Sequence, residues 1–257
     1  MSHLSHLSYF PDLNAQTPLK FVYTPVHGVG QPYAERAFAA FQFHPFISVD
    51  EQKDPDPEFS TVKYPNPEEG KETLECAIRT ANKHNADLIL ANDPDADRFA
   101  LAERDSSGSS SSGWRILSGN QLGTLLGWWR WFTWRNRNPT VNVKDVYMLY
   151  STVSSHILKS IAEVEGFNSI DTLTGFKWLG NRSNELLDQK KHVLFAFEEA
   201  MSVLFVDRDD RSQANIRVTF FSVDSCVIQR TFSIKMEYLP WPSEQKCAPI
   251  CTRLDEH

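Results

Sequence analysis

The sequence predicts an α/β fold built from two successive units, each of which alternates strands with helices. Short apolar runs rich in Val, Ile, Leu and Phe alternate along the chain with segments whose apolar residues recur at helical spacing. In the first unit the order is strand, helix, strand, helix, strand, which favours a parallel sheet with right-handed crossovers. The 257 residues are 41% hydrophobic, so they can bury a sizeable core.

The first unit is expected over residues 20–138, after an irregular lead-in over residues 1–19. Its second helix is expected to start at Asn66, a residue favoured as N-cap, with Pro67 at the first helical position. A later helix over residues 120–137 carries four Trp residues, and we expect them to pack against a neighbouring domain rather than to form a ligand cage. Strands are expected at residues 19–23, 46–49, 86–92, 99–103 and 114–117.

The second unit is expected over residues 145–200. Strands at 146–150, 167–170 and 193–197 alternate with helices that contain Ile157 to Ala162 and Leu186. The alternation stops near Met201, and none of the eleven Gly residues lies beyond position 180. Residues 203–206 and 217–234 have strand-like composition but no clear partner elements, so we expect residues 201–257 to be a divergent tail.

Composition argues against several classes of protein. A net charge of −7 without any block of Lys and Arg argues against a nucleic-acid partner. Four Cys residues without a CxxC pair predict reduced thiols rather than disulfides or a zinc site. The chain shows neither a secretory signal pattern nor 18 consecutive apolar residues, so we expect no membrane partner and a cytoplasmic location.

The strongest candidate for chemistry is the loop over residues 92–98, where Asp93, Asp95 and Asp97 follow an apolar strand. Three carboxylates this close repel one another unless they share a cation or spread into water. Hard oxygen ligands favour Mg²⁺. Because α/β proteins bind ligands beyond the carboxyl ends of their strands, the position favours a metal site over a solvated acidic turn.

Two other interpretations of the same aspartates fit less well. An EF-hand requires Gly at the sixth loop position and Glu at the twelfth, where this chain has Arg98 and Arg104. A phosphatase with an aspartyl nucleophile is expected to carry Thr or Val in place of Asp97.

Three further stretches are weaker candidates. Residues 174–181 lie between a strand and a helix and offer two Gly, a cation for a phosphate and donors for hydroxyls, although a plain turn would look the same. Glu198 and Glu199 end a strand and could accept hydrogen bonds from a polyol, although surface Glu pairs are common. Residues 27–30 could receive an anion at a helix start, but tight packing explains their two Gly better.

Taken together, residues 23–30, 92–98, 118–123, 174–181 and 197–200 resemble the α-D-phosphohexomutase superfamily, and within it the phosphopentomutase and phosphoglucomutase-2 branch. The resemblance implies two consecutive three-layer α/β/α domains of the phosphohexomutase type, the family's second domain and most of its third. The third domain would then be incomplete and followed by the unrelated tail.

The resemblance also implies a set of site residues. Asp93, Asp95 and Asp97 would hold Mg²⁺, and Arg98 would support catalysis by reaching towards the phosphoryl group. The residues implied for sugar binding are Thr174, Gly175, Lys177 and Glu198. The implied partners are sugar phosphates, with glucose 1,6-bisphosphate as activator, and the implied state is a monomer. Ala200, where many hexose-specific relatives carry Ser, fits a branch that also handles pentose phosphates.

Two of the family's motifs do not occur in these residues. They are the Thr-x-Ser-His-Asn loop with the phosphoserine of the first domain, and the Arg-Ser-Gly-Thr phosphate loop of the fourth. Two hypotheses follow. The chain is a Mg²⁺-dependent phosphomutase that interconverts pentose or hexose 1-phosphates with 5- or 6-phosphates through a phosphoserine and a bisphosphate, or it binds metal and sugar phosphate without turnover. Because covalent transfer requires the serine, we expect no turnover by this chain in isolation.

Overall fold

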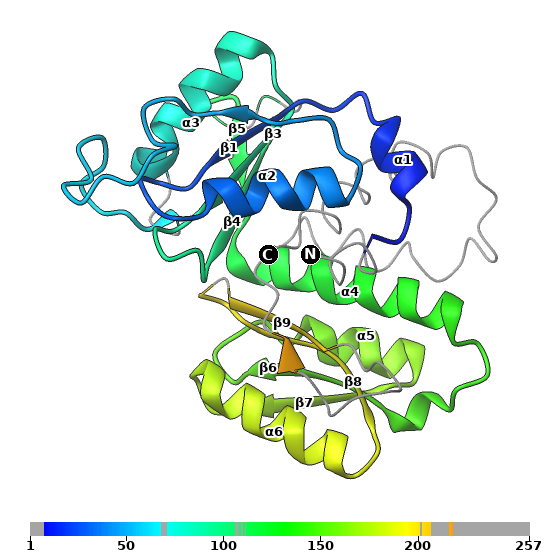
Figure 1. The fold of residues 1–257 in the computed structure, drawn as a ribbon. Helices are drawn as coiled ribbons and strands as arrows, with labels where there is room; N and C mark the ends of the chain where they lie inside the picture. The colour runs from blue at the N-terminus through cyan, green and yellow to red at the C-terminus, as the bar shows by residue number, and fades with distance from the viewer. Residues whose placement is uncertain are drawn as a thin grey trace.

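The fold is known from a computed structural model, which describes residues 8–67, 71–105, 108, 110, 112–200, 202–206 and 216–217. It contains two five-stranded sheets, with strand orders β2-β1-β3-β4-β5 and β10-β9-β8-β6-β7. Helices cover both faces of each sheet (Figure 1). The predicted α/β class and the two consecutive α/β/α layers are therefore confirmed.

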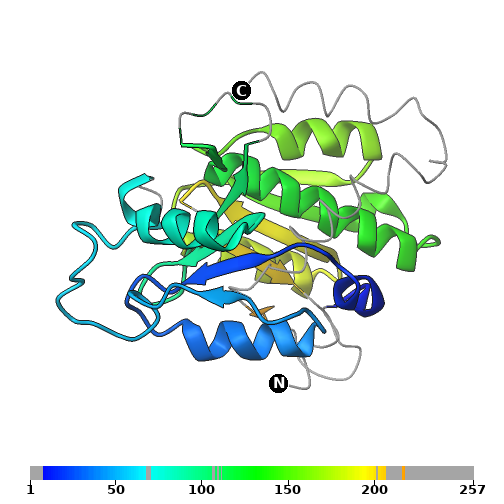
Figure 2. The same ribbon diagram turned by 90° about the horizontal axis from the view of Figure 1, so that it is seen from above.

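The first sheet combines parallel and antiparallel strands. β1 (Phe21–Thr24) pairs in parallel with β2 (Ile47–Ser48) and with β3 (Leu88–Asn92). β4 (Phe99–Arg104) and β5 (Trp114–Ile116) continue the sheet in antiparallel pairing. α2 (Gln31–Ala40) and α3 (Lys71–His84) cover opposite faces of it (Figure 2). Every residue of β1 and β3 is buried, as the apolar composition of a central parallel strand requires.

One local feature differs from the sequence expectations, and another is not tested. The lead-in contains a short helix, α1 (Pro11–Ala15), with Pro at its first position. α3 begins at Lys71, and residues 68–70, which separate it from Asn66 and Pro67, lie outside the described residues. The predicted cap at Asn66 is therefore not tested. The apolar residues Leu74, Ala77 and Ala81 of α3 are fully buried, and Ile78 is partly buried against the same cluster.

The second sheet has three parallel strands, β6 (Val146–Ser151), β7 (Asn168–Thr172) and β8 (His192–Glu198). A 3₁₀ turn, η3 (Val143–Asp145), leads into β6. α5 (Ile157–Glu165) packs in the same apolar cluster as α4 (Gly119–Arg137), whereas α6 (Phe176–Asp188) packs in the cluster on the other face. The predicted order of strands and helices in this half is confirmed.

The sheet does not end at residue 200, where the sequence analysis placed the boundary. β9 (Ser202–Val206) pairs antiparallel with β8, and β10 (Ile216–Arg217) pairs antiparallel with β9. Val203 is 5% exposed and belongs to the apolar core. The expected tail at 201–257 thus begins with strands of the second sheet, and residues 207–215 and 218–257 lie outside the described residues.

α4 lies between the two halves of the molecule (Figure 1). A Ser118 and Gln121 capping box starts it, and Trp131 packs on Phe167 of the second half. An added Cβ at Gly119, Gly123 or Gly127 would lie within 2.7 Å of the backbone of Glu199 or of side chains packed on the second sheet. The glycine face therefore lets the helix approach this sheet closely, although the sequence analysis assigned the helix to the first unit.

One apolar cluster runs through both halves, from Phe21 and Leu90 of the first sheet through Leu126 to Met148 and Phe195 of the second. Cys76 is buried and carries a free thiol, and the other three cysteines lie outside the described residues. Within the part of the chain that the structure describes, no helix is both long enough and apolar enough to cross a bilayer.

Candidate functional site

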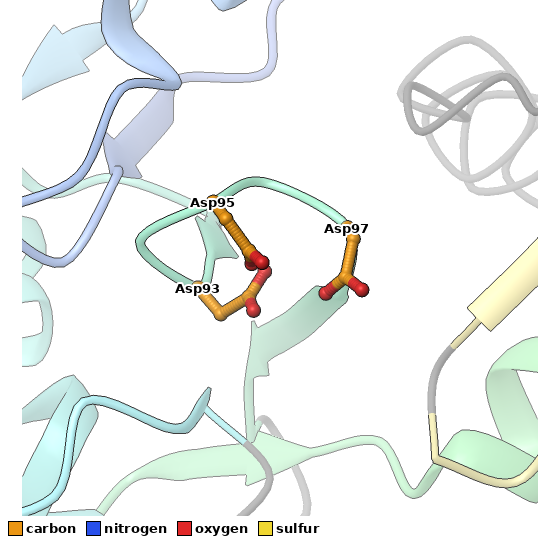
Figure 3. A group of neighbouring side chains, drawn as sticks. All are labelled: Asp93, Asp95 and Asp97. Atoms are coloured by element: carbon orange, nitrogen blue, oxygen red, sulfur yellow. The ribbon is translucent and has the colours of Figure 1, made fainter.

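The three aspartates follow β3 at the carboxyl end of the first parallel strands. Asp93, Asp95 and Asp97 each offer a carboxylate oxygen, and these oxygens all lie within 4.8 Å of one another. Figure 3 shows the Asp93 and Asp95 carboxylates converging, with that of Asp97 turned towards them from the far end of the loop. The structure thus brings together the side chains that the sequence assigned to a metal site.

Hydrogen bonds from its own backbone and from the strand beneath it shape this loop. The Ala96 N–H donates to the Asp93 carbonyl at 2.9 Å, with Ala96 at a φ of 60°. The Arg98 N–H donates to Oδ1 of Asp93 at 2.8 Å. Asn92 Nδ2 donates to the Arg98 carbonyl at 2.6 Å, while Asn92 Oδ1 accepts from the Tyr23 hydroxyl at 2.9 Å. The sequence analysis assigned no role to Tyr23 or Asn92, although a Tyr within a buried strand usually signals a hydrogen-bonded hydroxyl.

The loop has an unequal distribution of charge and burial. Asp93 is 2% exposed, whereas Asp95 and Asp97 are exposed. Burial raises the pKa of Asp93 to about 7, with a further contribution from its hydrogen bond to Asp95. The same hydrogen bond lowers the pKa of Asp95. Arg98 Nε lies 3.4 Å from Asp93 Oδ2 and 3.6 Å from Asp97 Oδ1, so its guanidinium lies beside two of the three carboxylates.

This donor set fits a hard divalent cation. The loop offers three carboxylates against one guanidinium, and a bound cation would favour the ionised form of Asp93 that burial disfavours. Oxygen ligands without nitrogen or sulfur are the set that Mg²⁺ prefers.

The turn between β1 and α2 lies against the same loop. A Cβ added at Gly28 would lie 2.1 Å from the Pro94 carbonyl oxygen, so only Gly fits there. The Val29 N–H donates to that oxygen at 2.9 Å. Close packing, the favoured interpretation of residues 27–30, is confirmed.

The residues expected to contact sugar occupy the carboxyl edge of the second sheet. Glu198 is 8% exposed, and its Oε1 accepts from the Gly175 N–H at 2.8 Å, at the start of α6. Thr174 and Lys177 flank this contact and are exposed. The carboxylate also lies at the positive end of the helix dipole.

The carboxylate of Glu199, next in the chain, has other partners. Glu199 Oε2 accepts from the hydroxyls of Ser151 and Ser154 at 3.0 and 2.9 Å. The two carboxylates therefore have different partners, and Glu198 is the one beside the residues at the start of α6.

Comparison with known families places both halves of the chain. Residues 1–108 match the model of phosphoglucomutase/phosphomannomutase alpha/beta/alpha domain II, and residues 119–219 match that of domain III. The chain belongs to the phosphoglucomutase/phosphomannomutase family. The match to domain III includes β9 and β10, and so extends beyond the resemblance seen in the sequence, which ended at Ala200.

Curated relatives are about half identical in sequence to this chain over the aligned residues. Human phosphopentomutase is 53% identical over 222 residues, and human glucose 1,6-bisphosphate synthase is 50% identical over 219. The alignments cover 81% and 83% of this chain but 36% and 35% of the relatives, so the chain spans about a third of their length.

Solved phosphomutase structures share the fold. Aspergillus fumigatus N-acetylphosphoglucosamine mutase in complex with GlcNAc-6P and magnesium superposes with a TM-score of 0.56 at 14% identity, covering 90% of this chain and 46% of that one. In this chain the aspartate loop belongs to the domain II match, whereas Thr174, Gly175, Lys177 and Glu198 belong to the domain III match.

Proposed function

We propose that this chain forms the Mg²⁺-binding and sugar-contacting part of a phosphomutase that acts on pentose or hexose phosphates. The observation that carries the proposal is the convergence of Asp93, Asp95 and Asp97 within 4.8 Å, with Asp93 buried. Family membership makes phosphoryl transfer the reaction class to test first.

In this proposal Asp93, Asp95 and Asp97 hold the metal ion. When bound, Mg²⁺ supplies positive charge that offsets the charge on a phosphoryl group in transfer. The Asp93 carboxylate must lose its proton to serve as a ligand. Arg98 is held beside Asp93 and Asp97 through its Nε, and its planar guanidinium is suited to binding phosphoryl oxygens.

On the second sheet, Lys177 and Thr174 supply an exposed cation and hydroxyl at the start of α6. Glu198 accepts from the Gly175 N–H through one oxygen, which leaves the second carboxylate oxygen for a sugar hydroxyl. These groups would orient a sugar phosphate rather than react with it.

The names of the relatives suggest the ligands. Phosphopentomutase and glucose 1,6-bisphosphate synthase together suggest ribose 1-phosphate or glucose 1-phosphate as substrate and glucose 1,6-bisphosphate as activator. Because the chain spans about a third of these relatives, turnover by the 257 residues is a separate question. We propose that they bind without turning over, since the first phosphoryl transfer requires a phosphoserine as donor and the return transfer requires the freed serine as acceptor.

The metal site is tested by Mg²⁺ titration of the full chain and of Asp95→Asn, with Asp54→Asn as an exposed acidic control. We expect Asp95→Asn to weaken Mg²⁺ binding by about tenfold or more at an unchanged thermal midpoint, because one ligand charge is lost from an exposed position. Unchanged affinity would refute the metal assignment.

A coupled assay with ribose 1-phosphate or glucose 1-phosphate, Mg²⁺ and catalytic glucose 1,6-bisphosphate tests turnover. Absence of turnover in a sample that binds Mg²⁺ and ribose 1-phosphate would support the proposal that the chain binds its ligands without catalysis. Turnover would show that another residue replaces the phosphoserine.

A further inference from the structure

His27 is a buried residue that the proposed chemistry does not use. It lies in the turn between β1 and α2, is 5% exposed, and has a φ of 60°. Val26 beside it has a φ of 46°. Positive φ is uncommon for residues other than Gly and costs free energy for a β-branched residue, so contacts elsewhere must hold this turn in place.

Those contacts come from a segment about 25 to 35 residues further along the chain. The His27 N–H donates to the Gln52 carbonyl at 3.0 Å, and the His27 carbonyl accepts from the Asp56 N–H at 3.1 Å. The imidazole Nε2 lies 2.7 Å from the Thr61 hydroxyl, and the ring meets Phe59 edge to face. Both the backbone and the side chain of His27 are therefore fixed by residues 52–61.

The same segment is tied to the strand beneath the turn. Gln52 is fully buried, and its amide accepts from the Thr24 hydroxyl at 2.7 Å and donates to Thr61 at 2.9 Å. Thr24 in turn accepts the Val26 N–H at 3.0 Å. A continuous set of hydrogen bonds thus runs from β1 through Gln52 and Thr61 to the His27 ring.

The turn fixed by these contacts packs against the aspartate loop, residues 92–98. Gly28 and Val29 follow His27 directly, and they make the close approach and the 2.9 Å hydrogen bond to the Pro94 carbonyl. Pro94 lies between two of the proposed ligands, Asp93 and Asp95. A shift of the turn would therefore move the peptide that joins the two carboxylates.

We infer that His27, clamped by Gln52 and Thr61, is a positioning residue that holds the aspartate loop in its metal-binding geometry. The inference rests on the proposed Mg²⁺ site and adds a remote support to it. Partners that orient metal ligands commonly change metal affinity by ten- to a hundredfold when they are removed.

The test compares His27→Asn with His27→Gln in the full chain. Asn tolerates positive φ but is too short to reach Thr61, whereas Gln places a polar atom near the position of Nε2. His84→Leu, at an exposed position in the last turn of α3, is the control. Mg²⁺ affinity is measured by calorimetry, and amide exchange of Ala96 and Arg98 is measured without metal.

We expect His27→Asn to weaken Mg²⁺ binding by about tenfold and to speed exchange of the Ala96 and Arg98 amides, while the thermal midpoint falls by only a few degrees because one hydrogen bond and one ring contact are lost. His27→Gln is expected to restore most of both properties. Wild-type affinity and exchange in His27→Asn would overturn the inference while leaving the metal site standing.

Failure of the unsubstituted chain to bind Mg²⁺ would overturn both the proposed site and this inference. Should His27→Asn not fold, Thr61→Val against Thr61→Ser repeats the comparison from the exposed end of the hydrogen-bond set. The valine variant is then expected to lose affinity and the serine variant to retain it, and equal affinities would overturn the inference.

Discussion

Mg²⁺ affinity is expected to fall steeply as pH is lowered through 7. Burial and the neighbouring carboxylates raise the pKa of Asp93 to about 7, so below this pH the metal must displace a proton from Asp93. With a pKa near 7, about nine-tenths of Asp93 is ionised at pH 8 and about one-tenth at pH 6. The apparent dissociation constant should therefore rise about tenfold between these two pH values.

Calorimetric titration at constant ionic strength in buffers of different ionisation enthalpy measures both the affinity and the protons released. We expect about one proton released per Mg²⁺ at pH 6 and close to none at pH 8. Asp93→Asn removes the titrating group, so its weaker binding should be nearly independent of pH over this range. Equal affinity and no proton release at pH 6 and pH 8 in the unsubstituted chain would refute the reasoning.

The raised pKa of Asp93 also affects the stability of the metal-free chain. The pKa of Asp93 is higher in the folded state than the ordinary value near 3.8, so between about pH 4 and pH 7 the folded state holds the extra proton. Stability should consequently fall as pH rises across this window, and added Mg²⁺ should stabilise the chain more at pH 8 than at pH 6.

Three further predictions concern packing, surface charge and the second sheet. Gly123→Val should destabilise the fold by about 1–3 kcal/mol in urea unfolding, because its Cβ would meet the Phe197 ring at 2.2 Å, whereas Gly180→Ala, with no atom within 4 Å, should stabilise it by about 0.5–1 kcal/mol; equal effects would contradict the close-packed helix. Lys177→Ala should weaken ribose 1-phosphate binding several-fold in titration without changing the thermal midpoint, while the exposed Lys190→Ala should change neither. A chain ending at residue 200 should have a lower thermal midpoint than one ending at 219, because it loses β9 and exposes β8, and equal midpoints would show that β9 adds no stability.

The aspartate loop shows what a local sequence pattern can predict and what it cannot. A buried strand composition followed by alternating aspartates placed three carboxylates at the end of β3, and the structure brings their oxygens together. Spacing does not say which of them is buried. Asp93 is the buried one, in a loop that is contacted from more than 60 positions away, since Tyr23 donates to Asn92 and the turn at Gly28 packs against Pro94.

In the second half of the chain, local patterns likewise predicted some elements and missed others. Periodicity predicted β6, β7 and β8 and the helices between them, since each pattern is local. It did not predict that β9 joins the sheet beyond residue 200, because strand pairing depends on an exposed partner edge that only the fold provides. Nor did it predict that Glu198 accepts from the Gly175 N–H at the start of α6, whereas Glu199 accepts from the Ser151 hydroxyl.

The sequence by itself therefore determined the fold class, the order of the elements and the position of the aspartate cluster at the end of β3, because periodicity and residue type are local properties. The tertiary structure decided which carboxylate is buried, on which sheet α4 packs, and which distant residues hold the His27 turn. Those outcomes depend on contacts between segments far apart in the chain, and no local pattern encodes them.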